Sequence, residues 1–235
     1  AALQEELARN AARCGIRVVG PNCQGVNYPY HNLCASWPLI TRRGEIAIAS
    51  QSGTVGAALI DWASEERLGF SAFVSMGNRV DVDEADLIEF FADDANTKVI
   101  ALYIEGVKDP AKFLSAVQKC RKPIVILKPG RTERGRKAAE SHTRSLAGND
   151  AIYDAVFRQF GIHRASTLEE LYDFAKALAY LPAPTGPRML IVTSSGGSAV
   201  IATDVATEEG FSVTQLPPAL ADQLRQFLPS HFIVG

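Results

Sequence analysis

The chain has 235 residues, enough for one large domain or for two domains of ordinary size. Hydrophobic residues make up 47% of it, and 24 basic side chains stand against 26 acidic ones, which gives a net charge of −2. This near balance argues against a nucleic-acid-binding protein. The longest apolar runs, such as residues 99–104, are far too short to cross a bilayer, and no signal-like pattern opens the sequence. We therefore expect a cytoplasmic protein that binds neither nucleic acid nor membrane.

The four cysteines are Cys14, Cys23, Cys34 and Cys120, and they form neither a CxxC pair nor a dense framework. This spacing predicts a reduced chain without a zinc site, and no other metal site is indicated. The sequence begins without Met and stops directly after an apolar run. We expect both ends to be cuts through a longer polypeptide.

The predicted elements begin with a helix over residues 3–14 and a short apolar strand over 16–20. Residues 21–43 are rich in Pro, Asn and Tyr without a sustained period, which is typical of a connector. Regular alternation follows: strands are predicted at 45–50, 71–76, 98–104 and 123–128, and helices at 53–66, 84–94 and 110–120. Strands rich in Val and Ile that alternate with amphipathic helices predict a parallel sheet covered on both faces.

A loop over residues 129–147 separates this pattern from two further predicted helices, at 149–160 and 167–180. Residues 181–187 hold three prolines and one glycine, and this composition indicates an interdomain linker. Beyond the linker, the order of strand, Ser/Gly turn and helix recurs. The segment "MLIVTSSGGSAVIATDVA" resembles the earlier "IAIASQSGTVGAALIDWA", so a second domain of the same kind is expected to start here.

Two turns are candidate phosphate sites: "SQSG" at 50–53 and "SSGG" at 194–197. Each joins a buried strand directly to a helix, whose N-terminus offers free N–H groups and the positive end of the helix dipole. Small residues let an anion approach closely. The alternative is an ordinary tight turn, since any strand-to-helix turn in an open sheet favours Gly and Ser. Two copies in tandem domains favour anion binding.

The polar segment "ESHTRSLAGND", residues 140–150, contains His142. Neither His163 nor the cysteines stand at ligand spacing, and no GxSxG motif indicates a serine hydrolase. Two alternatives remain: a solvated surface histidine, or a nucleophile that forms a phosphohistidine. Glu105 follows a buried strand and is a candidate acceptor that would hold the imidazole tautomer; otherwise it is an ordinary solvated glutamate.

The segment that leads to His142 is basic. Residues 127–144 hold six basic against two acidic side chains, a local charge of +4 in an otherwise balanced chain. Such a loop is either merely solvated or helps to attract a nucleotide or phosphate. The basic residues are Lys128, Arg131, Arg134, Arg136, Lys137 and Arg144, and the acidic ones are Glu133 and Glu140.

Six ordered motifs resemble the ADP-forming acetyl-CoA synthetases, within the superfamily of the succinyl-CoA synthetase α subunit and ATP-citrate lyase. They are "GPNCQGV" (20–26), "GEIAIASQSGTVGAAL" (44–59), "SMGNRVDVDEADLIEFFADD" (75–94), "YIEGVKDPAKF" (103–113), "ILKPGRTERGRKAAESHTRSLAGND" (126–150) and "SSGGSAVIATD" (194–204). The resemblance implies an α/β fold with two flavodoxin-like, succinyl-CoA-ligase-like parallel-sheet domains of three layers, α/β/α. The implied domains are the tail of a CoA-binding Rossmann-like domain (1–26), a connector (27–43), a domain with the phosphohistidine loop (44–180), a linker (181–187) and a truncated second domain (188–235).

The resemblance also implies a ligase that interconverts acid, CoA and ATP with acyl-CoA, ADP and phosphate, through an acyl phosphate and a phosphohistidine. His142 is the implied phosphoryl carrier and Glu105 the residue that orients it. The implied phosphate-binding residues are Ser52, Gly53 and Thr54 in the first domain and Gly196, Gly197 and Ser198 in the second; Pro21, Asn22 and Cys23 are expected near the CoA thiol arm.

The implied partners are CoA, a carboxylic acid, phosphate and an adenine nucleotide with Mg²⁺, which an ATP-grasp domain or subunit would bind. A homo-oligomer or an α/β hetero-oligomer is expected, and this part of the protein is expected to be inactive alone. One departure is Arg144, where family members usually have Gly. Two other functional hypotheses stay open. A non-catalytic regulatory or CoA-binding region of a protein acetyltransferase is one, although the presence of both His142 and Glu105 argues against it. The other is a pair of flavodoxin-like domains that only bind a small anion.

Overall fold

The computed structural model describes residues 2–37, 40–135, 137 and 149–228. Contacts divide the chain into two compact units, residues 1–181 and 182–235, so the boundary falls in the predicted linker. His142 and Arg144 lie outside the described residues, as does most of the predicted phosphohistidine loop. In the described part of the chain, no helix combines the length and the apolar character needed to cross a membrane.

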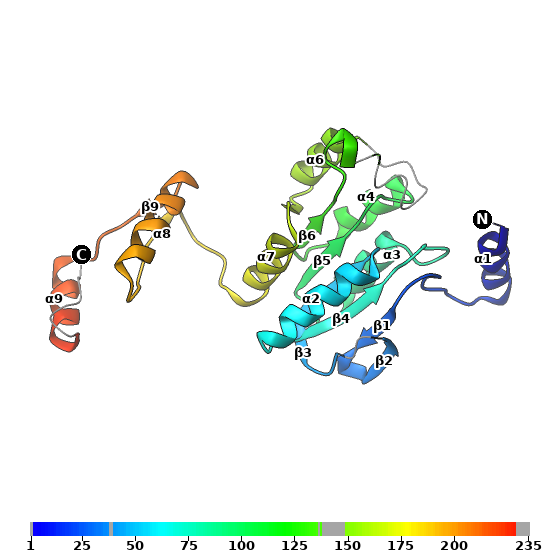
Figure 1. Cartoon of the computed structure of the whole chain (residues 1–235), viewed down its shortest axis with the longest axis horizontal. Helices are drawn as coiled ribbons and strands as arrows, with labels where there is room; N and C mark the ends of the chain where they lie inside the picture. Colours follow the sequence, from blue (N-terminus) through cyan, green and yellow to red (C-terminus); the bar gives the residue numbers. More distant parts are fainter. Residues whose placement is uncertain (1, 38–39, 136, 138–148, 229–235) are drawn as a thin grey trace. The chain divides into compact units, whose positions relative to one another are not determined.

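The first unit is built on a seven-stranded sheet with the order β2-β1-β4-β3-β5-β6-β7. Five of its strands run parallel, four of which were predicted from the sequence, and they form the centre and one side of the sheet (Figure 1). These strands are β3 (Arg43–Ser50), β4 (Phe70–Ser75), β5 (Val99–Tyr103), β6 (Ile124–Leu127) and β7 (His163–Ala165).

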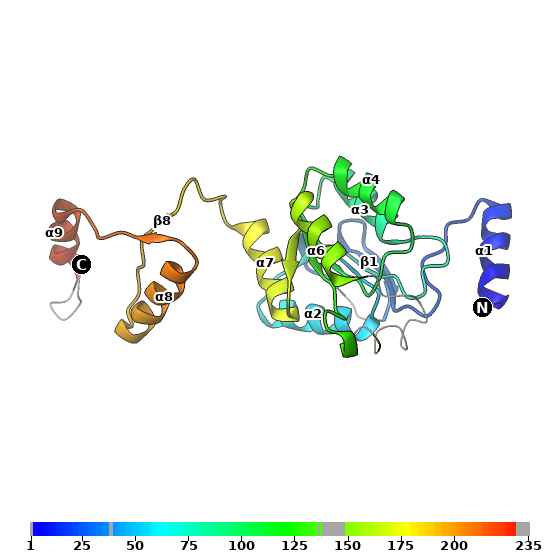
Figure 2. The ribbon, with the colours of Figure 1, turned by 90° about the horizontal axis from the view of Figure 1, so that it is seen from above.

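Helices cover both faces of this sheet, because alternate strand residues point to opposite sides. On β3, Ile46 and Ile48 pack with α2 (Gly53–Glu65) and α7 (Leu168–Tyr180). Ala47 and Ala49 belong to the opposite core with α3 (Glu84–Asp93), α4 (Pro110–Lys119) and α6 (Asp150–Gln159). Figure 2 shows α3 and α4 on the side of the sheet away from α2. The predicted three-layer α/β arrangement is thereby confirmed for this unit.

The segment expected to be a connector contributes to the sheet. It forms β1 (Gly25–Tyr28), the one-turn helix η1 (Pro29–His31) and β2 (Leu33–Ser36). The two strands make a hairpin, and β1 pairs antiparallel with β4. The prediction of irregular structure here was wrong because β1 is stabilised by hydrogen bonds to a strand far along the chain, which no local pattern reports.

Residues 16–20, predicted to be a strand, follow α1 (Ala2–Cys14) as a chain segment without strand pairing. The backbone N–H of Val18 donates to the carboxylate of Asp81 at 2.7 Å, and the Val18 carbonyl accepts from Val82 N–H at 3.1 Å. The Asp81 side chain thus accepts the hydrogen bond that a neighbouring strand would otherwise accept. The strand β7 was missed by sequence reasoning because it has only three residues.

The second unit repeats the predicted order of strand, turn and helix. It consists of β8 (Arg188–Met189), α8 (Gly196–Glu208), β9 (Ser212–Val213) and α9 (Pro218–Phe227), and the two strands pair in parallel. The apolar run after the linker, expected to be a longer strand, pairs over only two residues. Leu190 and Val192 just beyond it are 47% and 86% exposed, so no neighbouring element in the described part of the chain buries them.

Candidate functional site

The predicted site residues of the first unit gather where the parallel strands end. The carboxyl ends of β3, β4, β5 and β6 meet at one edge of the sheet, since these strands run side by side in the same direction. The turn into α2 follows β3, and Glu105 follows β5. Ligands of open parallel sheets bind at this edge.

Ser52 caps the N-terminus of α2. Its Oγ accepts from Val55 N–H at 3.5 Å and lies 3.1 Å from the hydroxyl of Thr54. The hydroxyl of Ser50 donates to the Ser52 carbonyl at 2.6 Å, which fixes the turn. Among the described residues, the N–H groups of Gly53 and Thr54 have no hydrogen-bond acceptor. They present the positive end of the helix dipole at the sheet edge, an arrangement suited to an anion.

Glu105 is buried, with 6% of its surface exposed, two residues beyond the end of β5. The side chain of Gln51 fixes its backbone: Oε1 accepts from the N–H of Glu105 at 2.8 Å and of Gly106 at 3.3 Å. Burial and, second, the negative charge of Glu105 raise the pKa of Tyr103 to about 12. The interpretation of Glu105 as an ordinary solvated residue is wrong, and its backbone lies beside Gln51, two residues before α2 begins.

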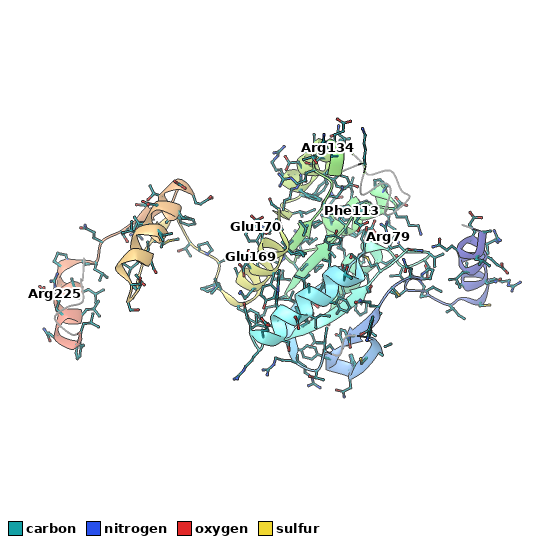
Figure 3. All side chains as sticks on the ribbon, viewed as in Figure 1. Arg79, Phe113, Arg134, Glu169, Glu170 and Arg225 are labelled. Carbon is teal, nitrogen blue, oxygen red and sulfur yellow. The ribbon has the colours of Figure 1, made fainter. Side chains whose placement is uncertain are left out.

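An ion pair also holds the loop of Glu105, through the carbonyl of the next residue, Gly106. Arg79 Nη1 lies 2.9 Å from Glu84 Oε2 and donates to the carbonyl of Gly106 at 2.7 Å. The other oxygen of Glu84 accepts from Lys108 N–H at 2.7 Å. Both side chains of the pair are largely buried, with 11% and 1% exposed, and Figure 3 labels Arg79 at the sheet end near α3. Sequence reasoning missed this clamp, because the two residues are ordinary surface types whose burial only the fold reveals.

The predicted CoA-proximal residues lie at the same edge. The carbonyl of Pro21 accepts from Asn78 N–H at 2.8 Å, and the Asn22 amide donates to the Asn78 side chain at 3.3 Å. Cys23 follows as an exposed free thiol. A Cβ on Gly77 would lie 2.3 Å from the Pro21 oxygen, so glycine is needed for this close contact.

Carboxylates also fasten the start of this segment. Arg17 pairs with Asp81 and with Asp86, each at 3.0 Å. Lys112 Nζ donates to Asp86 Oδ2 at 2.5 Å. Burial by itself would raise the pKa of Asp86, but the hydrogen bonds from Lys112, from the Asp83 backbone and from Arg17 outweigh it and lower that pKa. The segment is thereby held against the N-terminal end of α3.

Lys128 differs from the other basic residues of its segment. Its side chain is fully buried, with 0% exposed, directly after β6. Nζ donates to the Pro129 carbonyl at 2.7 Å and lies 4.9 Å from the ring centroid of Tyr153. Burial lowers its pKa, and the charge of Arg164 adds to this effect while Asp150 and Glu105 oppose it. Lys128 is therefore part of the interior beside the site and does not belong to a solvated basic loop.

The second candidate turn has the same local geometry as the first. Ser195 caps α8 and accepts from Ser198 N–H at 3.3 Å, while Gly196 and Gly197 form the exposed first turn of the helix. The structure brings together Pro21–Cys23, Ser52–Thr54 and Glu105 in the first unit. It describes Gly196, Gly197 and Ser198 only within the second unit. In the described ranges, no three His, Cys, Asp or Glu side chains are grouped so that they could hold a metal ion.

The parallel sheet with helices on both faces, the capped turn and the buried strand-end glutamate form a flavodoxin-like domain with a candidate anion site, and comparison with known proteins gives its class. Residues 43–178 match the family described as the succinyl-CoA ligase like flavodoxin domain. The chain belongs to this family.

Similar proteins define a narrower group within this family. The α subunit of acetate–CoA ligase [ADP-forming] I of Pyrococcus furiosus is 47% identical over 211 residues, which are 88% of this chain and 46% of that protein. The α subunit of isoenzyme II of the same organism is 41% identical over 228 residues, 96% of this chain and 50% of the relative. The resemblance to ADP-forming acetyl-CoA synthetases is thereby confirmed.

A solved structure agrees over almost the whole chain. The dinucleotide forming acetyl-coenzyme A synthetase 1 of Ca. Korarchaeum cryptofilum, in complex with phosphate and ADP, has a TM-score of 0.89 and 39% identity. The match covers 99% of this chain and 51% of that one. This chain thus spans about half the length of these three proteins.

Proposed function

We propose that this chain is the phosphoryl-transferring part of an ADP-forming acyl-CoA synthetase, which interconverts acid, CoA and ATP with acyl-CoA, ADP and phosphate. The observation that carries the proposal is the convergence of three features at one sheet edge. They are the free N–H groups at the start of α2, the buried carboxylate of Glu105, and the segment Pro21–Cys23. The two Pyrococcus relatives, 47% and 41% identical, are named ADP-forming ligases, and one solved relative was determined with phosphate and ADP.

The reaction would use these groups in sequence. Phosphate attacks the thioester carbonyl, CoA leaves as the thiol, and an acyl phosphate results. A nitrogen of His142 then attacks phosphorus, the acid leaves, and the phosphohistidine passes its phosphoryl group to ADP. Glu105 would accept a hydrogen bond from the other ring nitrogen and stabilise the charged ring. The N–H groups of Gly53 and Thr54, with the hydroxyl of Ser52, would stabilise the phosphoryl oxygens.

The proposal assigns the second turn, Gly196 to Ser198, the same task in a second flavodoxin-like domain, 188–235. Residues 1–26 would be the tail of a CoA-binding domain that brings the thiol arm to Cys23, and 44–180 the domain of His142, to whose sheet the hairpin of β1 and β2 is added. An ATP-grasp domain or subunit would bind the nucleotide with Mg²⁺, in a homo-oligomer or an α/β hetero-oligomer. The four free thiols agree with a reducing compartment, and we propose the cytoplasm.

The test uses the complete enzyme, including its nucleotide-binding part, with ATP labelled at the γ-phosphate and Mg²⁺. We expect an acid-labile, base-stable phosphate on the wild-type protein and none on His142→Ala. The matched control is His163→Ala, an exposed histidine on β7, which should keep the label. Acid-dependent consumption of CoA and ATP, with acetate as the first acid of a panel, should disappear only in the His142 variant.

Unchanged labelling of His142→Ala would contradict the proposal. A wild-type enzyme that consumes no CoA with any acid would contradict it as well. The second outcome would favour a domain pair that only binds an anion. The acetyltransferase alternative has no support among the relatives, since neither Pyrococcus protein nor the solved synthetase is named as one. It would require CoA-dependent acetylation of a protein without labelling of His142.

A further inference from the structure

Gln24 lies at the same sheet edge, immediately before β1. Its backbone N–H donates to the hydroxyl of Ser75 at 3.0 Å, and the next residue, Gly25, stands opposite Ser75 in the antiparallel pair of β1 with β4. β4 is the direct neighbour of β3. The backbone of Gln24 is therefore anchored to β4, next to the strand that leads into α2.

The side chain of Gln24 reaches across to the start of that helix. An ideal Cβ built on Gly53 would lie 2.9 Å from both Cγ and Cδ of Gln24 and 3.1 Å from its Nε2. Cα–Cβ bonds in a helix tilt toward the N-terminus, so a group packed at this point lies at the open end of α2. Glycine at position 53 thus makes room for the amide of Gln24 beside the free N–H groups.

This amide has no hydrogen-bond partner in the described part of the chain. Its Oε1 is buried from solvent and unpartnered, which ordinarily costs about 1–3 kcal/mol. No interaction among the described residues explains the carboxamide at this position. The amide nitrogen, Nε2, also has no partner among the described residues and lies at the start of α2, so its N–H groups could donate to an anionic ligand bound there.

We infer that Gln24 is a further binding residue of this site and that its amide holds a phosphoryl group at the N-terminus of α2. Nε2 donates to a phosphoryl oxygen, next to the N–H groups of Gly53 and Thr54. The inference rests on the proposed function. The phosphoryl group has two possible sources, free phosphate that enters the reaction and the phosphate carried on His142.

The test follows acyl-CoA cleavage by the complete enzyme with ADP and varied phosphate. We expect Gln24→Ala to raise KM for phosphate about tenfold or more, since hydrogen bonds to charged groups are the stronger ones. Gln24→Glu keeps the side-chain length that packs on Gly53, and its like charge should raise this KM further. Gln118→Ala, on the exposed face of α4, is the control and should leave KM unchanged.

The labelled phosphoenzyme separates the two sources. A raised KM for phosphate with normal labelling from ATP assigns Gln24 to free phosphate, and faster loss of the label in the variants assigns it to the phosphohistidine as well. Normal KM for phosphate together with normal labelling, or a change confined to KM for CoA, would overturn the inference. If the wild-type enzyme itself cleaves no acyl-CoA with phosphate, the proposed function fails instead. Thermal unfolding of each variant shows that the fold is retained.

Discussion

Gln51 and Glu105 follow the neighbouring strands β3 and β5, and the side chain of Gln51 binds the backbone of Glu105. Gln51 Oε1 accepts from Glu105 N–H at 2.8 Å, and its Nε2 donates to the carbonyl of Gly106 at 2.8 Å. The residue before the α2 turn thus sets the position of the loop that carries the carboxylate. These hydrogen bonds therefore connect the two parts of the proposed phosphoryl site, the turn before α2 and the loop of Glu105.

Replacement of Gln51 by Ala should loosen this link. It leaves the buried N–H of Glu105 without an acceptor, so we expect the free energy of unfolding to fall by about 1–3 kcal/mol. Hydrogen exchange at the amides of Glu105 and Gly106 should become faster, and the rate of phosphohistidine formation should fall. Gln118→Ala, on the surface of α4, is the matched control. Unchanged exchange at these two amides would contradict the link.

Replacement of Gly77 by Ala should displace the segment of Pro21 from the turn that follows β4. Gly77 has a φ of +54°, and an added Cβ would lie 2.3 Å from the Pro21 carbonyl oxygen. Gly161 has a φ of +66° with open space around it, so Gly161→Ala should cost only the conformational term, about 1 kcal/mol. Urea denaturation should show a clearly larger loss for Gly77→Ala. Equal losses in the two variants would show that the backbone contact is unimportant.

Replacement of two helix-capping residues, Ser52 and Thr167, separates an effect on stability from an effect on the reaction. Ser52 caps α2 with a long bond of 3.5 Å to Val55 N–H, whereas Thr167 caps α7 with a bond of 3.0 Å to Glu170 N–H. Thr167→Ala should lower stability by about 1 kcal/mol, and Ser52→Ala by no more than that. Only Ser52→Ala should slow labelling from ATP in the complete enzyme. A comparable slowing in Thr167→Ala would mean that the effect comes from stability alone.

Lys128 should give the protein a stability that increases at alkaline pH. Burial holds its pKa below the ordinary 10.5, so the unfolded chain binds more protons than the folded one between the two values. Unfolding free energy therefore rises with pH through the lowered pKa up to 10.5, and it carries the cost of the buried charge below that range. Chemical denaturation from about pH 7 to about pH 10 should show a steeper rise for the wild type than for Lys128→Met. Parallel curves for the two proteins would be incompatible with a lowered pKa.

Much of the first unit could be predicted because its signals are local. The apolar strands β3, β4, β5 and β6 and the helices between them are strongly periodic, and their observed ends lie within two residues of those expected. The hairpin of β1 and β2 was not predicted, because antiparallel pairing with β4 supplies its stability from outside the segment. The same reason explains why β7, with three residues, escaped notice.

The candidate site, like the fold, was predicted only in part from the sequence. The sequence by itself determined the chemical groups: a capped Ser/Gly turn before each of two helices, a carboxylate at a strand end, and a histidine in a basic segment. The order of these motifs also indicated the family. Such features depend on residue type and short spacing, which a sequence states directly.

Only the tertiary structure decided which of these groups meet and what holds them. Glu105 and Ser52 lie 53 positions apart in the chain, yet parallel pairing of β3 with β5 brings their loops to one edge. Gln51, Arg79 and Gln24 acquire their roles from contacts with distant residues, and Lys128 is buried because a sheet and a helix close around it. Burial and long-range hydrogen bonds are properties of the packed chain, and no local pattern encodes them.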